Sequence, residues 1–548
     1  MTEGACARPG LARPLVVALA CAWAALALFT YVVLPARLAP AEDAAILYLY
    51  SENLAETGVI SYCAGGPPVE GATDFGWMVL LAGLHRLGLD TYRAAGWLSL
   101  AAHLATAWLV MRIAARGGAR DARVFFAAAF GLFLVPALFA AVQGFSVLFF
   151  GFAVLLAGYF FLAGRARALA LASLAACLVR PDGVVYAVPL LIALPFVGSE
   201  PRSSALRAEL LWFALPGLAY FAWRRWLFGE WLPLPFYVKA DVARAFGPFH
   251  GASLGVSAMN LAFLAPLLAL FVWRLRALAP GERARPVALA VALVLVPSLF
   301  YSCMLLAQNI GGRFQYPIVL AGSVLPLALG SARPRAALHA GALALSLLAQ
   351  SAGWAAMALA TALVPLETTP ALARALAPIQ GARMAVSEAG RLPYYSRWEC
   401  VDLWGLNTPE FARRLVRPDD VVRLAPDLVV LHGSAGQYRE LLAAGPEGPE
   451  ASERSWASLV QNAYLGAARA GYELLLVPFE REPEGEGWLE RAGRFARRVQ
   501  AERGEALRHD LYLLAPASEH KAEIERVLRA HGAIDVQGYA ERLRKRER

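Results

Sequence analysis

Residues 40–77 read PAEDAAILYLYSENLAETGVISYCAGGPPVEGATDFGW and form the most polar stretch of the first hundred residues. They follow an apolar run at residues 14–36 that carries no charged side chain. Such a run is long enough to cross a hydrocarbon core of about 30 Å at about 1.5 Å per residue. Glu42 and Asp43 therefore stand close to a membrane surface, where acidic side chains are uncommon without a functional reason. We expect them at the mouth of a membrane-embedded active site that faces away from the cytoplasm.

The composition supports a membrane protein. Of the 548 residues, 58% are hydrophobic and only 17% are charged, which is too apolar for an ordinary soluble protein of this length. The net charge of +9 comes mostly from arginines between apolar runs, so it indicates membrane topology and not nucleic-acid binding. The six cysteines show no zinc-like spacing.

The apolar runs predict an α-helical polytopic membrane protein with about eleven transmembrane helices. The predicted spans are residues 14–36, 92–111, 124–142, 146–164, 168–180, 183–198, 209–228, 252–273, 287–307, 316–331 and 337–364. Arginines before the first span place the N-terminus in the cytoplasm, and almost all later arginine clusters then fall on the same side. This agreement requires that residues 75–90 lie in the membrane interface and do not cross it.

An odd number of spans places residues 366–548 outside the cytoplasm. Short apolar runs at 383–388, 427–432, 472–478 and 511–515 alternate there with helix-like stretches, which predicts an extracytoplasmic α/β domain. Residues 1–365 form the predicted transmembrane domain, with a first outer loop at about 37–91. In this topology Cys63 and Cys400 share a compartment, which permits a disulfide, although two separate thiols are the simpler expectation.

The unusual polar residues collect on the outer side. They include the acidic pair, Arg180 in an RPDG turn, Lys239 and Arg313. Carboxylates and cations together suit a substrate with an anionic head and a greasy tail. A carboxylate can accept a proton from an attacking hydroxyl, while lysine and arginine bind phosphate.

Each of these residues also has an ordinary structural interpretation. Glu42 and Asp43 could simply place negative charge at the start of a helix. Arg180 could extend to the interface beside a tight turn, and Lys239 and Arg313 could be interfacial anchors. Their combination on one side of the membrane favours a binding site.

The motifs form an ordered series. In the first loop they are Glu42-Asp43-Ala44, Ile46, Tyr50, Asn53, Gly58, Val69-Glu70-Gly71, Thr73 and Trp77. Later come Arg180-Pro181-Asp182-Gly183, Leu232-Pro233 with Phe236-Tyr237 and Lys239, Arg313-Phe314 with Pro317, Gly390 with Pro393-Tyr394-Tyr395, and Asp402 with Gly405-Leu406-Asn407. This series, between about residues 40 and 415, resembles that of the GT-C membrane glycosyltransferases, especially the branch containing the mycobacterial arabinofuranosyltransferases. The chain departs from that pattern at Glu42, where Asp is usual, at Leu49, where Arg is usual, and at Ser146, which replaces a carboxylate.

The resemblance implies an inverting glycosyltransferase that uses a polyprenyl-phosphate sugar donor in a bacterial inner membrane. Its acceptor would be a hydroxyl of a cell-envelope glycan, glycolipid or protein. Asp43 would be the base, with Glu42 as its helper or alternative. Lys239, Arg313 and Arg180 would bind the donor phosphate, and Tyr237, Asn53, Glu70 and Thr73 would line or brace the site. The resemblance leaves a divalent metal at the acidic first loop open.

Two other functions are compatible with the sequence. A transporter or flippase of lipid-linked sugars more often has paired repeats with charges near mid-membrane, whereas here the polar residues gather at one face. A non-catalytic scaffold would use the outer domain to recruit envelope proteins.

Overall fold

The computed structural model describes residues 13–33, 38–116, 140–246, 251–304, 309, 312–329, 341–342, 344–345, 368–478 and 509–539. The predicted spans at 124–142 and 337–364 lie largely outside the described residues. The chain divides into two compact units. The helical unit comprises Met1–Ala36, Ala95–Phe221 and Pro248–Ala358, and the α/β unit comprises Arg37–Ala94, Ala222–Gly247 and Leu359–Arg548. The predicted domain boundary near residue 365 stays a prediction.

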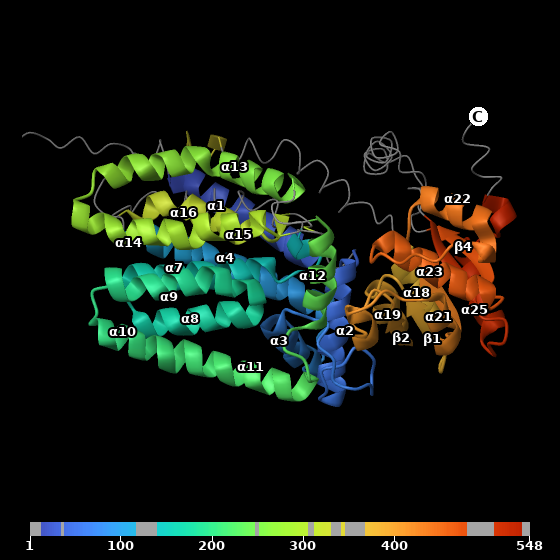
Figure 1. The fold of residues 1–548 in the computed structure, drawn as a ribbon. Coiled ribbons are helices and arrows are strands. Elements are labelled where there is room, and N and C mark those ends of the chain that lie inside the picture. Colours follow the sequence, from blue (N-terminus) through green and yellow to red (C-terminus); the bar gives the residue numbers. More distant parts are fainter. Residues whose placement is uncertain are drawn as a thin grey trace, which may run out of the picture. The chain divides into compact units, whose positions relative to one another are not determined.

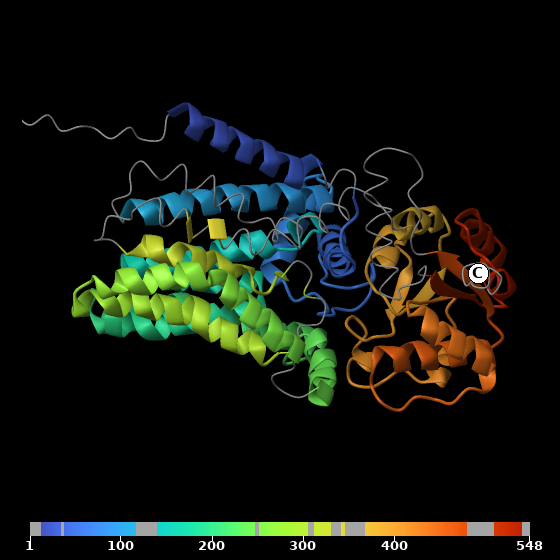
Figure 2. The same ribbon diagram turned by 90° about the horizontal axis from the view of Figure 1, so that it is seen from above.

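The helical unit consists of long helices that run alongside one another (Figure 1 and Figure 2). They are α1 (Arg13–Leu28), α4 (Thr91–Arg116), α7 (Val147–Ala163), α8 (Ala166–Val179), α9 (Val184–Val197), α10 (Arg202–Glu209), α11 (Leu215–Phe228), α13 (Gly251–Arg276), α14 (Pro280–Ala290), α15 (Val296–Ser302) and α16 (Tyr316–Val324). Residues 91–94 of α4 and residues 222–228 of α11 belong to the α/β unit. Short π or 3-10 turns continue several of them: η1 (Phe29–Val33), η2 (Pro181–Gly183), η3 (Leu210–Ala214), η4 (Val291–Leu295) and η6 (Leu325–Ala328). Helices therefore occupy the predicted spans wherever the structure describes those residues.

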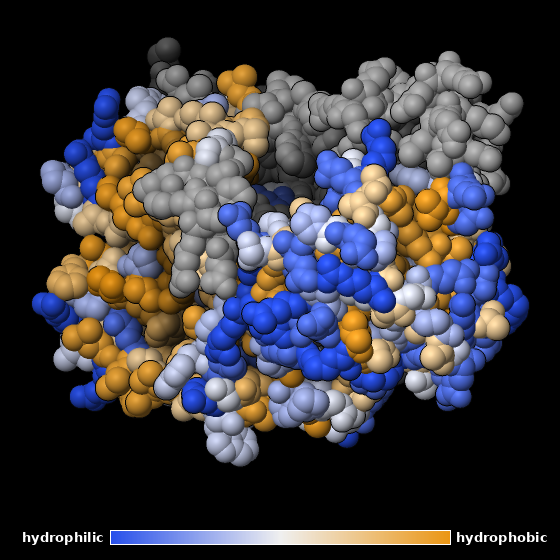
Figure 3. Space-filling view, turned by 45° about the vertical axis from the view of Figure 1, so that its right-hand side comes forward, coloured by the Kyte–Doolittle hydropathy of each residue, from blue (hydrophilic) through white to orange (hydrophobic). Residues whose placement is uncertain are grey.

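Three helical stretches within the described residues are long and apolar enough to cross a membrane, namely Thr91–Arg116, Ser253–Arg276 and Pro280–Ser302. Four shorter apolar stretches accompany them, at Val147–Ala163, Ala166–Val179, Pro181–Val197 and Tyr316–Ala328. The predicted number of about eleven spans is not confirmed by these lengths. In the space-filling view the visible surface of the helical unit is largely hydrophobic, whereas the visible face of the α/β unit is largely hydrophilic (Figure 3).

Small residues allow close helix packing in the helical unit. A Cβ on Gly151 of α7 would lie 2.3 Å from the Tyr316 ring, and one on Gly158 would lie 2.9 Å from the Leu293 side chain. Contacts of this kind are typical of membrane helices, where packing, and not a hydrophobic driving force, holds helices together.

The α/β unit is built on a five-stranded sheet in the order β2-β1-β3-β5-β4. The strands are β1 (Arg383–Val386), β2 (Glu399–Asp402), β3 (Leu428–Leu431), β4 (Glu473–Pro478) and β5 (His509–Leu514). β1 pairs in parallel with β2 and β3, while β5 is antiparallel to both β3 and β4. The predicted α/β architecture is therefore confirmed, with β2 added to the four predicted strands.

Helices complete this unit. They are α18 (Thr369–Leu376), α19 (Arg391–Ser396), α20 (Pro409–Ala412), α21 (Pro418–Leu424), α22 (Ala435–Ala444), α23 (Trp456–Arg469) and α25 (Lys521–Ala530). The apolar side of α23, including Leu459 and Ala463, packs with Val429 and Leu511 of the sheet in one buried core.

Three helices from earlier in the chain belong to the same unit: α2 (Glu42–Thr57), α3 (Phe75–Arg86) and α12 (Leu234–Phe246). With 12 residues, α3 spans only about 18 Å at about 1.5 Å per residue, which is too short to cross a bilayer. This length agrees with the predicted interfacial position of residues 75–90. Cys63 and Cys400 are free thiols, and the Cys63 Sγ lies 3.2 Å from the Cys400 carbonyl oxygen.

Candidate functional site

The acidic pair begins α2, and its first member is tied to the C-terminal part of the same unit. The Glu42 carboxylate accepts hydrogen bonds from the backbone N–H groups of Gly390 at 2.7 Å and Arg391 at 2.9 Å. The Arg391 Nε lies 3.8 Å from this carboxylate and donates to the Pro40 carbonyl at 2.6 Å. Burial raises the pKa of Glu42, while Arg391 and the two N–H groups counteract the rise. Glu42 is therefore held as an anchor of the first loop.

Gly390 is required by this contact. A Cβ at that position would lie 2.1 Å from the Glu42 carbonyl oxygen and 2.8 Å from its carboxylate. Only glycine lets the loop after β1 approach the start of α2 so closely.

Asp43, the predicted base, is half-buried beside Glu42 at the start of α2. Its charge and that of Glu42 both act on Glu388, which follows β1. The pKa of Glu388 is raised to about 8 by burial first and by the neighbouring carboxylates second. Asp43 therefore belongs to a group of acids on α2 and at the end of β1.

Three of the predicted supporting residues, Asn53, Thr73 and Glu70, form contacts within or around the first loop. Asn53 is buried and donates from Nδ2 to the carbonyls of Ser61 and Tyr62, both at 3.0 Å. Thr73 donates to the Asp74 carboxylate at 3.2 Å.

Glu70 braces the same loop through a buried ion pair. Its carboxylate accepts two hydrogen bonds from the Arg224 guanidinium, one of them 2.7 Å long. Its backbone carbonyl also accepts from the Leu234 N–H at 3.0 Å, which links the loop to α12.

Tyr237 and Lys239 lie on α12. The Tyr237 hydroxyl accepts from the Leu232 N–H at 3.3 Å, and the Arg413 guanidinium lies 4.3 Å from the centre of its ring. Arg413 also forms two hydrogen bonds with Glu230, at 2.9 and 2.5 Å. Lys239 is exposed, and its role in binding phosphate stays a prediction.

Arg180 and Arg313 belong to the helical unit. Arg180 donates to both oxygens of Asp182 at 3.0 Å, and the Tyr301 hydroxyl donates to the same carboxylate at 2.6 Å. Arg313 is buried, with its guanidinium 4.1 Å from the centre of the Phe145 ring. Both guanidinium groups also lie close to the Phe314 ring, at 5.1 and 5.2 Å from its centre. The two arginines therefore lie around one aromatic ring. Within the RPDG motif, Arg180 and Asp182 form an ion pair, which the sequence alone did not indicate.

The Asp402 motif forms a closed turn. The Asp402 carboxylate accepts from the N–H groups of Trp404 at 2.9 Å, Gly405 at 3.2 Å and Asn407 at 2.8 Å. A Cβ on Gly71 would lie 2.0 Å from the Asn407 side-chain oxygen. The Val-Glu-Gly segment of the first loop therefore packs directly against this turn.

Sequence reasoning missed three polar residues at one edge of the sheet. His432 follows β3, and its Nδ1 lies 2.7 Å from the Asp510 carboxylate at the start of β5. The His432 Nε2 lies 3.8 Å from Glu388. For Glu388 and His432 the available signal was their position, because polar residues that follow neighbouring parallel strands meet at the carboxyl edge of a sheet. Asp510 lies at the start of the antiparallel β5, so its position carried no such signal.

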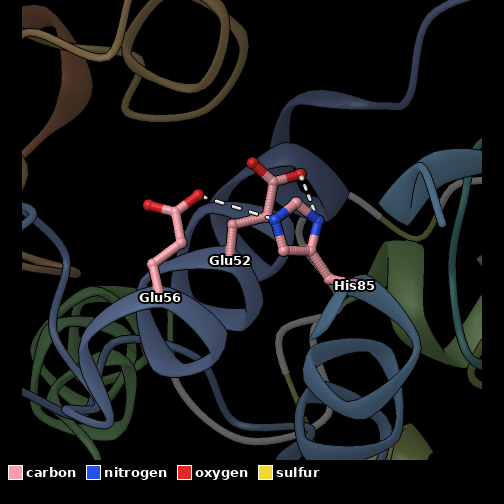
Figure 4. A group of neighbouring side chains, drawn as sticks. All are labelled: Glu52, Glu56 and His85. Atoms are coloured by element: carbon pink, nitrogen blue, oxygen red, sulfur yellow. Dashed lines mark ion pairs between the residues drawn. The ribbon is translucent and has the colours of Figure 1, made fainter. Parts of the chain in front are cut away.

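Among the described residues, one group of three has the composition of a metal site, namely Glu52, Glu56 and His85 (Figure 4). The His85 ring nitrogens lie 3.8 Å from Glu52 and 3.5 Å from Glu56. The Arg397 guanidinium lies 3.2 Å from Glu52 and 2.6 Å from Glu56, so it already supplies the positive charge.

Further contacts occupy the same Glu52 oxygen that faces His85. The hydroxyls of Thr91 and Tyr394 donate to it at 2.7 and 2.8 Å. The group therefore fits an arginine-bridged carboxylate pair and does not fit a metal centre. A divalent metal at the acidic first loop stays a prediction.

Comparisons with known proteins show which solved structures this fold resembles. Residues 361–485 match a family described as a domain of unknown function (DUF8728). No curated protein matches this sequence. The crystal structure of ArnT from Cupriavidus metallidurans bound to undecaprenyl phosphate aligns with a TM-score of 0.50 and 16% identity, over 81% of this chain and 96% of ArnT. The chain has an ArnT-like fold.

The apo structure of the same ArnT also matches, with a TM-score of 0.37 and 18% identity over 81% of this chain and 97% of that one. The ArnT-like fold, mostly helical with a small C-terminal sheet, agrees with the predicted fold class. Both of these structures are of ArnT, and neither belongs to the arabinofuranosyltransferase branch that the motifs resemble, so that branch is not supported by them.

Proposed function

We propose that this chain is an integral-membrane inverting glycosyltransferase of the GT-C type. It moves a sugar from a polyprenyl-phosphate donor to a hydroxyl of a cell-envelope glycan, glycolipid or protein. The donor class is supported by the ArnT-like fold, because the solved ArnT structure has undecaprenyl phosphate bound. The motifs, whose resemblance extends to the arabinofuranosyltransferase branch, support the reaction class.

The observation that carries the proposal is the fixed position of the acidic pair. The Glu42 carboxylate accepts hydrogen bonds from the N–H groups of Gly390 and Arg391. These bonds fix the first turn of α2, which also carries Asp43. A rigidly placed, half-buried carboxylate suits a general base, which must meet its proton donor in a defined geometry.

In the proposed reaction the Asp43 carboxylate removes the proton of the acceptor hydroxyl. The hydroxyl oxygen attacks the anomeric carbon, and the carbon–oxygen bond to the lipid phosphate breaks with its electron pair on the phosphate. Lys239, Arg313 and Arg180 stabilise the negative charge of that phosphate. For Arg180 this means sharing its guanidinium between Asp182 and the donor, because two of its N–H groups already face Asp182.

The proposed location is a bacterial inner membrane, with a cytoplasmic N-terminus and an extracytoplasmic α/β domain. This orientation rests on the arginine distribution between the apolar runs.

Transfer from radiolabelled polyprenyl-phosphate sugars, assayed in membranes that contain the full chain, tests this proposal. The variant Asp43→Asn retains the shape of the side chain and loses the base. We expect its transfer rate to fall by roughly 100-fold or more, the usual contribution of a positioned base. Full transfer by the double variant Asp43→Asn/Glu42→Gln would overturn the mechanism. A wild-type chain that moves the labelled lipid across the membrane without transferring its sugar would favour the transporter function instead.

A further inference from the structure

Three chemically active side chains converge at one edge of the sheet, outside the residues assigned to sugar transfer. β1 and β3 are parallel, with Val386 beside Val430, and β5 is antiparallel, with Leu511 beside Leu431. The carboxyl ends of β1 and β3 therefore meet the start of β5. Glu388, His432 and Asp510 all lie at this edge.

His432 is held in a defined orientation. Its backbone N–H donates to the Ser387 hydroxyl at 2.8 Å, and its carbonyl accepts from the Trp456 Nε1 at 2.8 Å. An ionised carboxylate only accepts hydrogen bonds, so the 2.7 Å contact with Asp510 requires the proton on Nδ1. The other nitrogen, Nε2, then carries the lone pair on the side that faces Glu388 at 3.8 Å.

Glu388 lies in the loop that contacts Glu42, the first member of the acidic pair. This loop leads from β1 to Gly390, whose N–H bonds to Glu42. The charged and titratable groups around Glu388 are Glu42 and Asp43 on α2, His432 after β3, Asp510 and Tyr512 on β5, and Tyr438 on α22. Burial, followed by the charge of Glu42, raises the pKa of Glu388 to about 8, so this carboxyl can gain and lose a proton near neutral pH.

The side chains of Glu388 and His432 are both accessible to water. The Glu388 side chain is 30% exposed and that of His432 is 19% exposed. The distance of 3.8 Å between them exceeds a hydrogen bond, so a proton crosses it after a side-chain rotation or through one bridging water.

We propose that Glu388, His432 and Asp510 form a proton relay that receives the acceptor-hydroxyl proton from Asp43 and releases it to water. The relay rests on the proposed sugar transfer. Asp43 takes the proton as the new glycosidic bond forms and the lipid phosphate leaves with its electron pair. Glu388, which holds a proton near neutral pH, gives that proton to Nε2 of His432, whose imidazolium form Asp510 stabilises, and then takes the new proton from Asp43. Loss of one proton to water restores the starting state, so no oxidant, reductant or co-reactant is needed.

Transfer assays of Glu388→Gln, His432→Asn and Asp510→Asn across pH 5–9 test the relay. We expect His432→Asn to lower the turnover by roughly 10-fold or more at pH 7, with partial rescue by added imidazole. Glu388→Gln should remove the ionisation near pH 8 from the pH–rate profile. A purely structural role would give neither the rescue nor the altered profile, and unchanged profiles in folded variants would overturn the relay.

His520→Asn is the matched control. His520 lies 3.5 Å from a glutamate, Glu519, and beside Gly381 just before β1, at the opposite end of that strand. Its replacement should leave the turnover and the pH–rate profile unchanged, and the thermal unfolding of all four variants shows whether each one folds.

Nuclear magnetic resonance of histidine-labelled full-length protein provides a second test that needs no sugar transfer. The relay requires that the titration of His432 shift by about half a pH unit or more in Glu388→Gln and in Asp43→Asn. A titration that neither variant alters overturns the relay. If the wild type transfers no sugar, the proposed function fails, and the titration then decides separately whether the proton network exists.

Discussion

The Glu42 carboxylate accepts a 2.7 Å hydrogen bond from the backbone N–H of Gly390, although the two residues lie 348 positions apart. This contact joins the start of α2 to the loop after β1, and the N–H of Arg391 adds a second bond at 2.9 Å. Hydrogen bonds to an ionised acceptor are roughly twice as strong as neutral ones. The acidic first loop is therefore fixed by Glu42, one of its own two acids.

Replacing Gly390 by alanine should break this junction. The new Cβ would lie 2.1 Å from the Glu42 carbonyl oxygen, so one of the two backbone segments must move. We expect a loss of roughly 2–4 kcal/mol in the free energy of unfolding, from overpacking and weakened hydrogen bonds. Thermal unfolding of the purified chain measures it. Gly436→Ala in α22 is the control, since nothing lies within 4 Å of its Cβ position. Equal unfolding midpoints for the two variants would contradict the argument.

Substitutions should show that Glu42 and Asp43 have different roles. Glu42→Gln keeps an oxygen that can accept from Gly390 and Arg391, whereas Glu42→Ala removes it. We expect the alanine variant to lose about 2–3 kcal/mol of stability, since hydrogen bonds to charged groups contribute roughly 1.5–3 kcal/mol. Glu42→Gln should retain transfer within about fivefold of the wild type, while Asp43→Asn should lose roughly 100-fold or more with little change in stability. A Glu42→Gln variant as inactive as Asp43→Asn would show that Glu42 takes part in the chemistry.

The helix positions could be predicted because an uninterrupted apolar run in lipid must satisfy its own backbone hydrogen bonds, and a helix does so locally. The strands at residues 428–431 and 473–478 were equally visible as short apolar runs. β2 was missed because its sequence, ECVD at 399–402, has polar residues at both ends. α19 was missed because it is only six residues long.

The sequence selects candidate site residues but does not show how they pair. Glu42, Glu70 and Arg180 were selected from motifs, yet the partner of each acid lies far along the chain. Arg224, the partner of Glu70, sits inside an apolar stretch that reads as part of a membrane span. Sequence order carries no information about such contacts. His432 and Asp510 lay outside every motif, and only the sheet topology brings them together.

The buried pair of Glu70 and Arg224 provides a test of the first loop. Removing one partner leaves an uncompensated buried charge, so Arg224→Met should cost about 3–5 kcal/mol of stability. The double variant Glu70→Gln/Arg224→Met removes both charges and should recover part of that loss. Thermal unfolding of the single and double variants gives the coupling energy. Strictly additive losses would mean that the two side chains do not interact in the folded protein.

Arg397 should exclude metal ions from Glu52, Glu56 and His85. Its guanidinium lies 2.6 Å from Glu56 and 3.2 Å from Glu52. Removing it in Arg397→Ala leaves two carboxylates and a histidine, a ligand set that suits zinc or cobalt with an open fourth position. We expect cobalt to bind this variant at least about 10-fold more tightly than the wild type, as judged by visible absorption. Arg397→Lys, which keeps the charge, should bind no better than the wild type. Equal cobalt binding by all three proteins would show that Arg397 does not control the site.

Glu388 should make the stability of the protein depend on pH. Its pKa in the folded state is about 8, raised by burial and by Glu42, whereas an unfolded glutamate has a pKa of about 4.3. Between these values the folded state holds a proton that the unfolded state has released, so the wild type loses stability as the pH rises from about 4 to about 8. Glu388→Gln cannot ionise and escapes this loss.

The difference between wild type and Glu388→Gln should therefore grow with pH, in favour of the variant. We expect it to reach roughly 1–3 kcal/mol by pH 8.5, since one unit of pKa shift corresponds to about 1.4 kcal/mol and 30% of the side chain is exposed. Unfolding midpoints at pH 5, 7 and 8.5 measure the trend. Glu399→Gln on β2 is the control, because Glu399 is 59% exposed and, among the described ion pairs, pairs only with Arg383, which is 43% exposed. If the two glutamine variants follow the same pH dependence, Glu388 does not hold its proton in the folded state, and the relay loses the carboxyl on which it depends.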